Sequence, residues 1–215
     1  VYGDLSEELP FDMPVPLGKP VRISTFEDAN LLHDHVTGRS AMGILHFVNQ
    51  TPVEWFSKRQ NTVETATYGS EFVVARTATE QIIDLCYTIC MLGVPLDGPA
   101  WMFGDNESVV NSSIQIDAKL HKRHNALSFH RVREAIASGH FVFTHIPGEN
   151  NPADIVSKHW GYSSIWHMLR TLQYVEGDTI GAPGKDEKLC VPESRRTSIP
   201  NGEMMELASH VRVQK

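Results

Sequence analysis

Residues 100–108 read AWMFGDNES, an apolar run of four residues followed by a glycine and a carboxylate. The apolar run predicts a short buried strand. It places Asp105 directly after that strand, and open α/β sheets carry their ligand sites at such strand ends. A carboxylate in this position is therefore a candidate site residue.

Three other carboxylates stand at the ends of predicted elements. Asp28 follows a strand-like run, Glu71 lies in the first turn of a long helical segment, and Asp154 opens the last helix. Helical spacing puts Glu71 on the buried stripe, which is costly for a charged group unless a cation or hydrogen bonds compensate. The alternative is that the Glu71 carboxylate is placed there only because it interacts favourably with the positive end of the helix. The four acids together predict one metal-binding cluster.

The hydrophobic pattern predicts an α/β protein. Alternating residues indicate three antiparallel strands at 21–26, 42–48 and 53–57, the last two joined as a hairpin across 49–52. The pattern then predicts a helix over 67–92, a strand at 100–103, helices over 106–113 and 125–138, a strand at 140–146 and a final helix from 153. The order βββαβαβα fits a mixed five-stranded sheet, three strands antiparallel and then two parallel, flanked by helices.

Length and composition favour a globular domain with flanking segments. The chain has 215 residues, 41% of them hydrophobic, which is enough to bury a full core. No apolar stretch approaches the ~18 residues that span a bilayer, and the first residues lack the features of a secretory signal. We therefore expect no membrane partner and a cytosolic or nuclear location.

The cysteines and histidines predict no zinc site. Cys86 and Cys90 are four residues apart in a predicted helix and are interpreted as core residues. The histidines considered as metal ligands are scattered rather than paired at zinc spacing and are interpreted as structural or surface residues: His121, His124, His130, His159 and His167.

The net charge of −7 is unevenly distributed. Residues 1–18 hold four acids and no Lys or Arg, whereas the middle of the chain is basic. The basic positions are Lys58, Arg59, Lys119, Lys122, Arg123, Arg131 and Arg133. They form either a ridge that contacts nucleic-acid phosphates or an ordinary solvated helix face, and the sequence leaves both readings open.

Five short motifs follow one another along the chain. They are the pair Asp28-Ala29, WFSKRQ at 55–60, TYGSEF at 67–72, GDNES at 104–108 and NNPADIVSK at 150–158. In order and spacing they resemble the ribonuclease H domain of copia-type LTR retrotransposon Pol polyproteins. The resemblance implies a ribonuclease H-like domain at 21–160, after an extended linker at 1–20 from an upstream reverse transcriptase connection. A packed C-terminal helix is expected at 161–175 and a flexible tail at 176–215.

The resemblance implies an endonuclease that hydrolyses the RNA strand of RNA/DNA hybrids during reverse transcription, with a reverse transcriptase domain upstream in the same polyprotein. By position, the catalytic and metal-binding residues would be Asp28, Glu71, Asp105 and Asp154. They would share two Mg²⁺ ions about 3.5–4 Å apart, with Mn²⁺ as an alternative. The implied locations are cytoplasmic virus-like particles and the nucleus.

Further residues are assigned to the nucleic acid and to proton transfer. The residues expected to contact the hybrid are Lys58, Arg59, Asn106, Ser108, Lys122 and Arg123. His145 is the nearest counterpart of the flexible-loop histidine of cellular ribonucleases H and is an auxiliary candidate. Asn30 stands where family members often carry a second acid.

Two other functions remain open. An integrase-like metal nuclease usually relies on three acids with a glutamate on the last helix, whereas here the last acid is Asp154 and the helical glutamate comes second. A non-catalytic remnant or domesticated binding module would not need all four acids.

Overall fold

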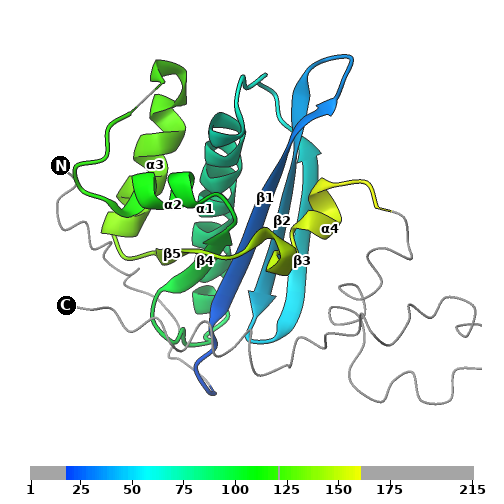
Figure 1. Ribbon diagram of the computed structural model, residues 1–215. Coiled ribbons are helices and arrows are strands. Elements are labelled where there is room, and N and C mark those ends of the chain that lie inside the picture. Colours follow the sequence, from blue (N-terminus) through cyan, green and yellow to red (C-terminus); the bar gives the residue numbers. More distant parts are fainter. Residues whose placement is uncertain (1–17, 121, 161–215) are drawn as a thin grey trace, which may run out of the picture. The chain divides into compact units, whose positions relative to one another are not determined.

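Five strands of the described residues form one mixed sheet in the order β3-β2-β1-β4-β5 (Figure 1). The computed structural model describes residues 18–120 and 122–160. The strands are β1 (Ile23–Asp34), β2 (Arg39–Val48), β3 (Thr51–Arg59), β4 (Ala100–Gly104) and β5 (Phe141–His145). β1, β2 and β3 are antiparallel neighbours, while β4 is parallel to both β1 and β5. The predicted α/β sheet is confirmed.

Helices accompany the sheet as predicted. They are α1 (Thr67–Met91), α2 (Glu107–Ile114), α3 (Ala126–Ala137) and α4 (Asp154–Ser157), with short 3₁₀ turns η1 (Arg123–Asn125) and η2 (Gly148–Asn150). α1 packs on β1 and β2 and contacts α3, whereas α4 contacts β1, β2 and β3. Met42 and Ile44 of β2 lie in the core shared with α1, and Gly43 between them faces α4. Because side chains alternate along a strand, α1 and α4 lie on opposite faces of the sheet.

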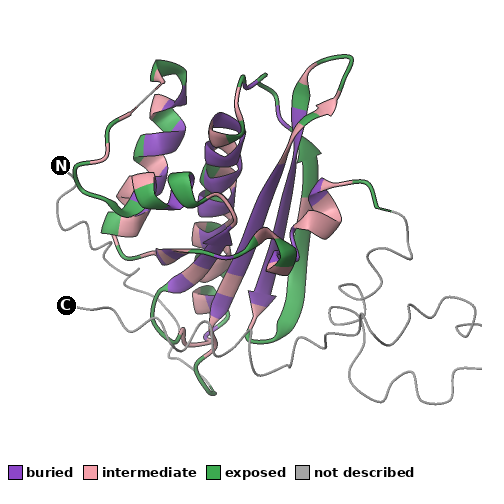
Figure 2. Ribbon diagram, viewed as in Figure 1, coloured by how far each residue is buried: buried purple, intermediate pink, exposed green. Residues whose placement is uncertain are grey.

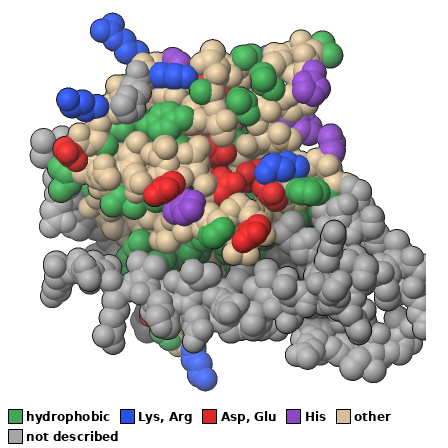
Figure 3. All heavy atoms as spheres, viewed as in Figure 1, with side chains coloured by type: hydrophobic (Ala, Val, Ile, Leu, Met, Phe, Trp, Pro, Cys, Tyr) green, Lys and Arg blue, Asp and Glu red, His purple; other side chains and the backbone are tan. Residues whose placement is uncertain are grey.

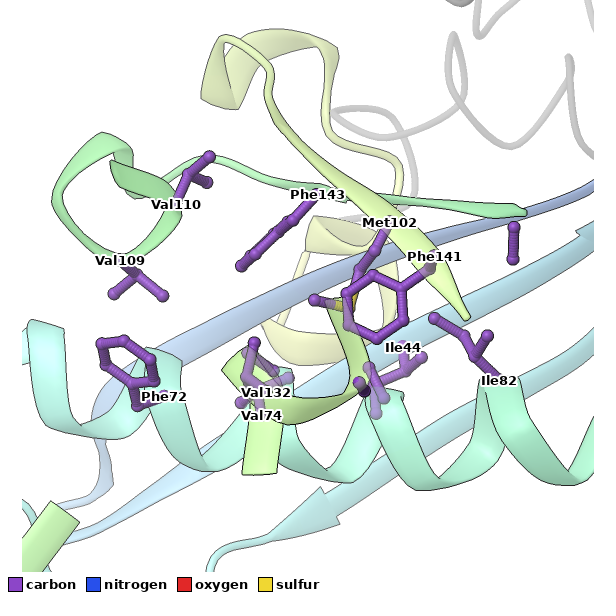
Figure 4. Packing of buried hydrophobic residues seen from close by; sticks show 14 of the residues in the cluster. Ile44, Phe72, Val74, Ile82, Met102, Val109, Val110, Val132, Phe141 and Phe143 are labelled. Carbon is purple, nitrogen blue, oxygen red and sulfur yellow. The ribbon is translucent and has the colours of Figure 1, made fainter. Parts of the chain in front are cut away.

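The main core lies between the sheet and α1 with α3 (Figure 4). Its fully buried side chains include Val74, Ala78 and Ile82 of α1, four residues apart on one helical face, together with Met102 and Phe143 from the sheet. Burial colouring shows the same division, with β1 and β2 buried and the edge strand β3 exposed along almost its whole length (Figure 2). The long helix α1 is thus held by its apolar stripe.

The C-terminus of α1 follows from local chemistry. Gly93 has a φ of 76°, in the left-handed region, and its N–H donates to the carbonyl of Cys90. The N–H of Val94 reaches back to the carbonyl of Ile89, so the last turn of the helix is closed. Pro95 follows and cannot continue a helix. The predicted end at Leu92 is correct to within one residue.

Strand β1 is longer than predicted. It does not end near Phe26 but continues to Asp34, so Asp28 lies inside the strand rather than at its end. Residues 27–30 continue to pair with β2, with Asp28 opposite Gly43. Polar side chains in this part obscured the strand pattern, although the backbone pairing does not depend on them.

Two arginines of the predicted basic ridge have structural partners. Arg131 donates to both carboxylate oxygens of Glu80, at 2.9 and 3.1 Å, and to Glu134. Arg133 donates to carbonyls at the end of α2, among them those of Ser112 and Gln115 at 2.6 Å each. Each of these two arginines therefore links α3 to another helix, and a phosphate contact by either stays a prediction.

Cys86 packs against the core as predicted, and burial raises the pKa of its thiol to about 11. Cys90 is half-buried. Within the described residues no helix is both long and apolar enough to cross a bilayer. The predicted helix at 161–175, the tail at 176–215 and most of the linker at 1–20 lie outside the described residues.

Candidate metal centre

Three of the four predicted acids meet at one point. Asp28, Glu71 and Asp105 each place a carboxylate oxygen within 4.8 Å of the others. The fold explains the meeting, because β1 and β4 are parallel neighbours in which Glu27 pairs with Gly104, so the next residues, Asp28 and Asp105, lie at the same level. Glu71 comes from the first turns of α1, which packs on β1.

The three acids line a pocket of about 390 Å³. Its other lining residues are Ala29, Thr67, Asn106, Glu107, Ser108 and Lys158. Figure 3 shows this face, with acidic side chains gathered near its centre and a basic side chain beside them. The pocket is therefore strongly acidic and carries one positive charge.

Burial disfavours the charged forms of these carboxylates and raises their pKa values. Loss of hydration raises the pKa of Asp28 to about 6, while Ser157 and Lys158 act in the opposite direction. Burial, followed by the charges of Glu27 and Asp28, raises the pKa of Glu71 well above its ordinary range. Burial also raises the pKa of Asp105. Carboxylates this close repel one another unless a proton or a cation neutralises them.

The donor set fits a divalent cation. Mg²⁺ and Mn²⁺ prefer carboxylate oxygens, and here three side chains offer them from three separate elements. Within the described residues, Oε2 of Glu71 is buried and has no hydrogen-bond partner. A buried carboxylate oxygen without a partner is costly, and a bound cation would satisfy it.

Asp154 lies next to this group but outside it. It begins α4, and a lysine stands between it and β1: Nζ of Lys158 is 2.5 Å from Oδ1 of Asp154 and 3.5 Å from Oδ1 of Asp28. The hydroxyl of Ser157 donates to Asp28. Asp154, the fourth predicted acid, therefore lies beside the pocket and is paired with Lys158, which lines it.

A glycine permits this docking of α4. A Cβ on Gly43 would lie 2.6 Å from the carbonyl oxygen of Ala153 and 2.8 Å from the nitrogen of Ser157. Asn30, the residue in place of a second acid, has its amide nitrogen 3.5 Å from the carbonyl of Ser157 and 3.0 Å from His33. Asn30 therefore helps to hold the segment after α4 against β1.

The predicted nucleic-acid residues fall into two groups. Asn106 and Ser108 line the pocket, and the side chain of Asn106 also caps α2 by accepting from the N–H of Val109. The other four do not line it. Lys58 and Arg59 end β3, two strands from Asp28, and Arg59 pairs with Asp34.

Lys122 and Arg123 lie near η1. Nζ of Lys122 donates to the hydroxyl of Thr65 at 3.0 Å, and Arg123 is exposed in the first position of η1. A phosphate-binding role for these basic residues stays a prediction. His145, at the end of β5, has Nε2 3.1 Å from the carbonyl oxygen of Asp105. The auxiliary candidate therefore lies beside one of the three acids.

Sequence reasoning assigned no role to Lys158, Ser157 or Glu27. Lys158 and Ser157 were inside the quoted motif at 150–158, but their contact with Asp28 spans about 130 positions of the chain. Glu27 is fully buried, and its carboxylate fills the space left by the missing side chain of Gly104. The sequence did offer one signal for Glu27, because it is a charged residue directly before Asp28 in a strand that begins with an apolar pattern.

The raised pKa of Asp28 predicts a pH effect on stability. A folded-state pKa of about 6, against an ordinary 3.8, means that the folded state holds a proton which the unfolded state releases. Without divalent cations, the free energy of unfolding should therefore fall by about 1 kcal/mol from this group as pH rises from 5 to 7, which is part of a loss of about 3 kcal/mol over the whole window from below pH 3.8 to above pH 6. Urea unfolding in chelator at the two pH values measures it. Asp28→Asn should weaken the dependence, and an unchanged dependence in that variant would contradict the assignment.

Comparison with known proteins gives relatives among mobile elements. No protein-family model matches the chain. The chain is 22% identical over 141 residues to the retrovirus-related Pol polyprotein from transposon RE2 of Arabidopsis thaliana, and 21% identical over 141 residues to that from transposon RE1. Each alignment covers 66% of this chain and 10% of the relative, so the chain spans about a tenth of the length of these relatives.

Solved structures of similar shape include ribonuclease H domains. One is the N-terminal RNase H domain of a Mycobacterium tuberculosis protein, with 12% identity, a TM-score of 0.48 and coverage of 64% of this chain and 91% of that chain. Another is LC11-RNase H1, isolated from compost, with 18% identity, a TM-score of 0.48 and coverage of 63% and 91%. The predicted resemblance to retrotransposon Pol polyproteins is confirmed by the two relatives, and the described residues form the mixed five-stranded sheet that the resemblance implied.

Proposed function

We propose that this domain is a cation-dependent ribonuclease H that hydrolyses the RNA strand of RNA/DNA hybrids. The observation that carries the proposal is the meeting of Asp28, Glu71 and Asp105 in one pocket, from a strand, a helix and a strand end. Three carboxylates so close together destabilise the fold unless they are neutralised. Such a cost is typical of a functional site.

Asp28, Glu71, Asp105 and Asp154 would hold two Mg²⁺ ions, or Mn²⁺ in their place. When bound, such ions stabilise charge on the attacking and leaving oxygens of a phosphodiester and lower the pKa of a bound water. Asp105 is partly exposed and would face the incoming strand, whereas Asp28 and Glu71 are buried and would form the base of the site.

Other residues of the chain would bind and orient the substrate. Ser108 and Asn106 line the pocket beside Asp105 and would contact the sugar-phosphate backbone. His145 contacts the backbone carbonyl of Asp105 and would donate a proton to the leaving oxygen. Lys58, Arg59, Lys122 and Arg123 are proposed to contact phosphates of the hybrid away from the cut.

The biological setting is proposed from the relatives. Both are Pol polyproteins of transposons. We place the domain in a longer Pol protein with a reverse transcriptase domain upstream, acting during reverse transcription in virus-like particles of the cytoplasm or in the nucleus.

A substrate panel tests the proposed activity. The purified chain is incubated with Mg²⁺ and a labelled strand in an RNA/DNA hybrid, in duplex RNA and in duplex DNA. Cleavage of RNA in the hybrid alone is expected, because recognition of RNA depends on its 2′-hydroxyls and on the shape of the duplex. Joining of DNA strands would favour an integrase-like nuclease. Binding of the hybrid without cleavage at any Mg²⁺ or Mn²⁺ concentration would favour a non-catalytic module.

A further inference from the structure

Lys158 brings a positive charge into the acidic pocket from the end of α4. Its ammonium bridges Asp154 and Asp28, at 2.5 and 3.5 Å. The lysine side chain is 33% exposed, whereas that of Asp28 is only 2% exposed. One cation supplied by the chain therefore occupies the space between two of the acids to which we assign divalent cations.

The backbone next to Lys158 is held firmly. Ser157 donates its hydroxyl to Asp28, the amide of Asn30 reaches the carbonyl of Ser157, and Gly43 leaves room for the backbone of Ser157. The lysine side chain beyond it is a flexible four-carbon stem with a compact charge. The ammonium can thus leave the two acids by rotation of its side chain while α4 stays in place.

We propose that Lys158 is a built-in competitor of the divalent cation, an inference that rests on the proposed function. An ammonium group and a divalent ion cannot use the same oxygens of Asp28 and Asp154, and their like charges repel across this partly buried pocket. With no divalent ion bound, the single positive charge of Lys158 offsets part of the negative charge of Asp28 and Asp154 and stabilises the fold. The ion must displace the ammonium, which weakens its binding to the free protein.

The displaced ammonium has a natural partner in the substrate. A phosphate of the hybrid entering the pocket would pair with Lys158 in place of the two acids. Substrate binding would then free Asp28 and Asp154 for the divalent ions. Through Lys158, filling of the cation site is therefore coupled to the arrival of nucleic acid.

Titration of the free protein with Mn²⁺, followed by the electron paramagnetic resonance signal of the unbound ion, tests this competition. Lys158→Met should bind Mn²⁺ about tenfold more tightly than the unchanged protein, because the competing charge is gone. Lys158→Arg, which keeps the charge, and Lys119→Met, which removes an exposed lysine that does not line the pocket, should stay within about twofold. Equal or weaker binding by Lys158→Met would overturn the inference.

Failure of the inference can be told from failure of the proposed function. If the unchanged protein binds Mn²⁺ through Asp28 and Lys158→Met does not alter the affinity, only the competition is wrong. If neither protein binds Mn²⁺, both are wrong. Melting in chelator gives a second readout: Lys158→Met should lower the melting temperature, because it leaves two acids without their counter-charge, and Lys158→Arg should not. A melting temperature unchanged in Lys158→Met would also count against the inference.

Discussion

Asp105→Asn should abolish hydrolysis of the RNA/DNA hybrid, with a loss of at least about 10²–10³-fold in rate. Asparagine keeps the size of the side chain and one oxygen, but it removes the charge that would bind a cation. Binding of the hybrid should change by no more than a few-fold, because the phosphate contacts proposed for the basic residues are untouched. The rate is measured with a labelled RNA strand under single-turnover conditions.

The matched control is Asp97→Asn. Asp97 is more than half exposed and pairs with Arg22 outside the pocket, so its substitution should leave the rate unchanged. Asp105→Asn should also fold at least as well as the unchanged protein, since burial and the charge of Asp154 already raise the pKa of Asp105. Hydrolysis that persists in a folded Asp105→Asn protein would contradict the proposed role.

Phe72→Ala should cost about 3–5 kcal/mol of folding free energy. Phe72 follows Glu71 in α1, is fully buried, and its ring lies 5.0 Å from that of Tyr68 and 5.7 Å from that of Phe129. The substitution leaves a cavity between α1 and α3, which the surrounding helices fill only in part. A fall in melting temperature of roughly 10–20 °C is expected for a domain of this size.

An exposed apolar residue provides the control for Phe72. Leu127 lies on α3 and is 78% exposed, so Leu127→Ala should change stability by about 0.5 kcal/mol or less. Chemical unfolding of the two variants gives the comparison. Similar losses in both would show that the described core does not carry the stability of the domain.

Periodic apolar residues made most of the fold predictable. The stripe of Val74, Ala78 and Ile82 located α1, and Gly93 with Pro95 located its end. The hairpin of β2 and β3 and the order of elements then determined the sheet, because few topologies satisfy short right-handed connections. The extent of β1 was missed, since its polar second half carries no apolar alternation.

The site was predictable only where one residue carries its own signal. Asp105 is a carboxylate directly after an apolar strand, and Glu71 is a carboxylate on the apolar face of a helix. Packing alone explains neither position, so both were identified as candidate site residues. Lys158 carries no such signal, because its partners, Asp28 and Asp154, become neighbours only when α4 docks on the sheet. Contacts of Arg131 and Arg133 with other helices were hidden in the same way. The local sequence can identify a residue whose type does not suit its position in a strand or helix. The partners of that residue become neighbours only in the folded chain, so the local sequence does not identify them.

Asp28, Glu71 and Asp105 should bind a divalent cation together. Crystals of the domain soaked in Mn²⁺ and measured for anomalous scattering would locate the ion. A strong anomalous peak is expected among the three carboxylates, with Asp154 released from Lys158, and no such peak in Asp28→Asn crystals. Saturating Mn²⁺ with no peak at these carboxylates, or with the same peak after Asp28 is replaced, would contradict this expectation.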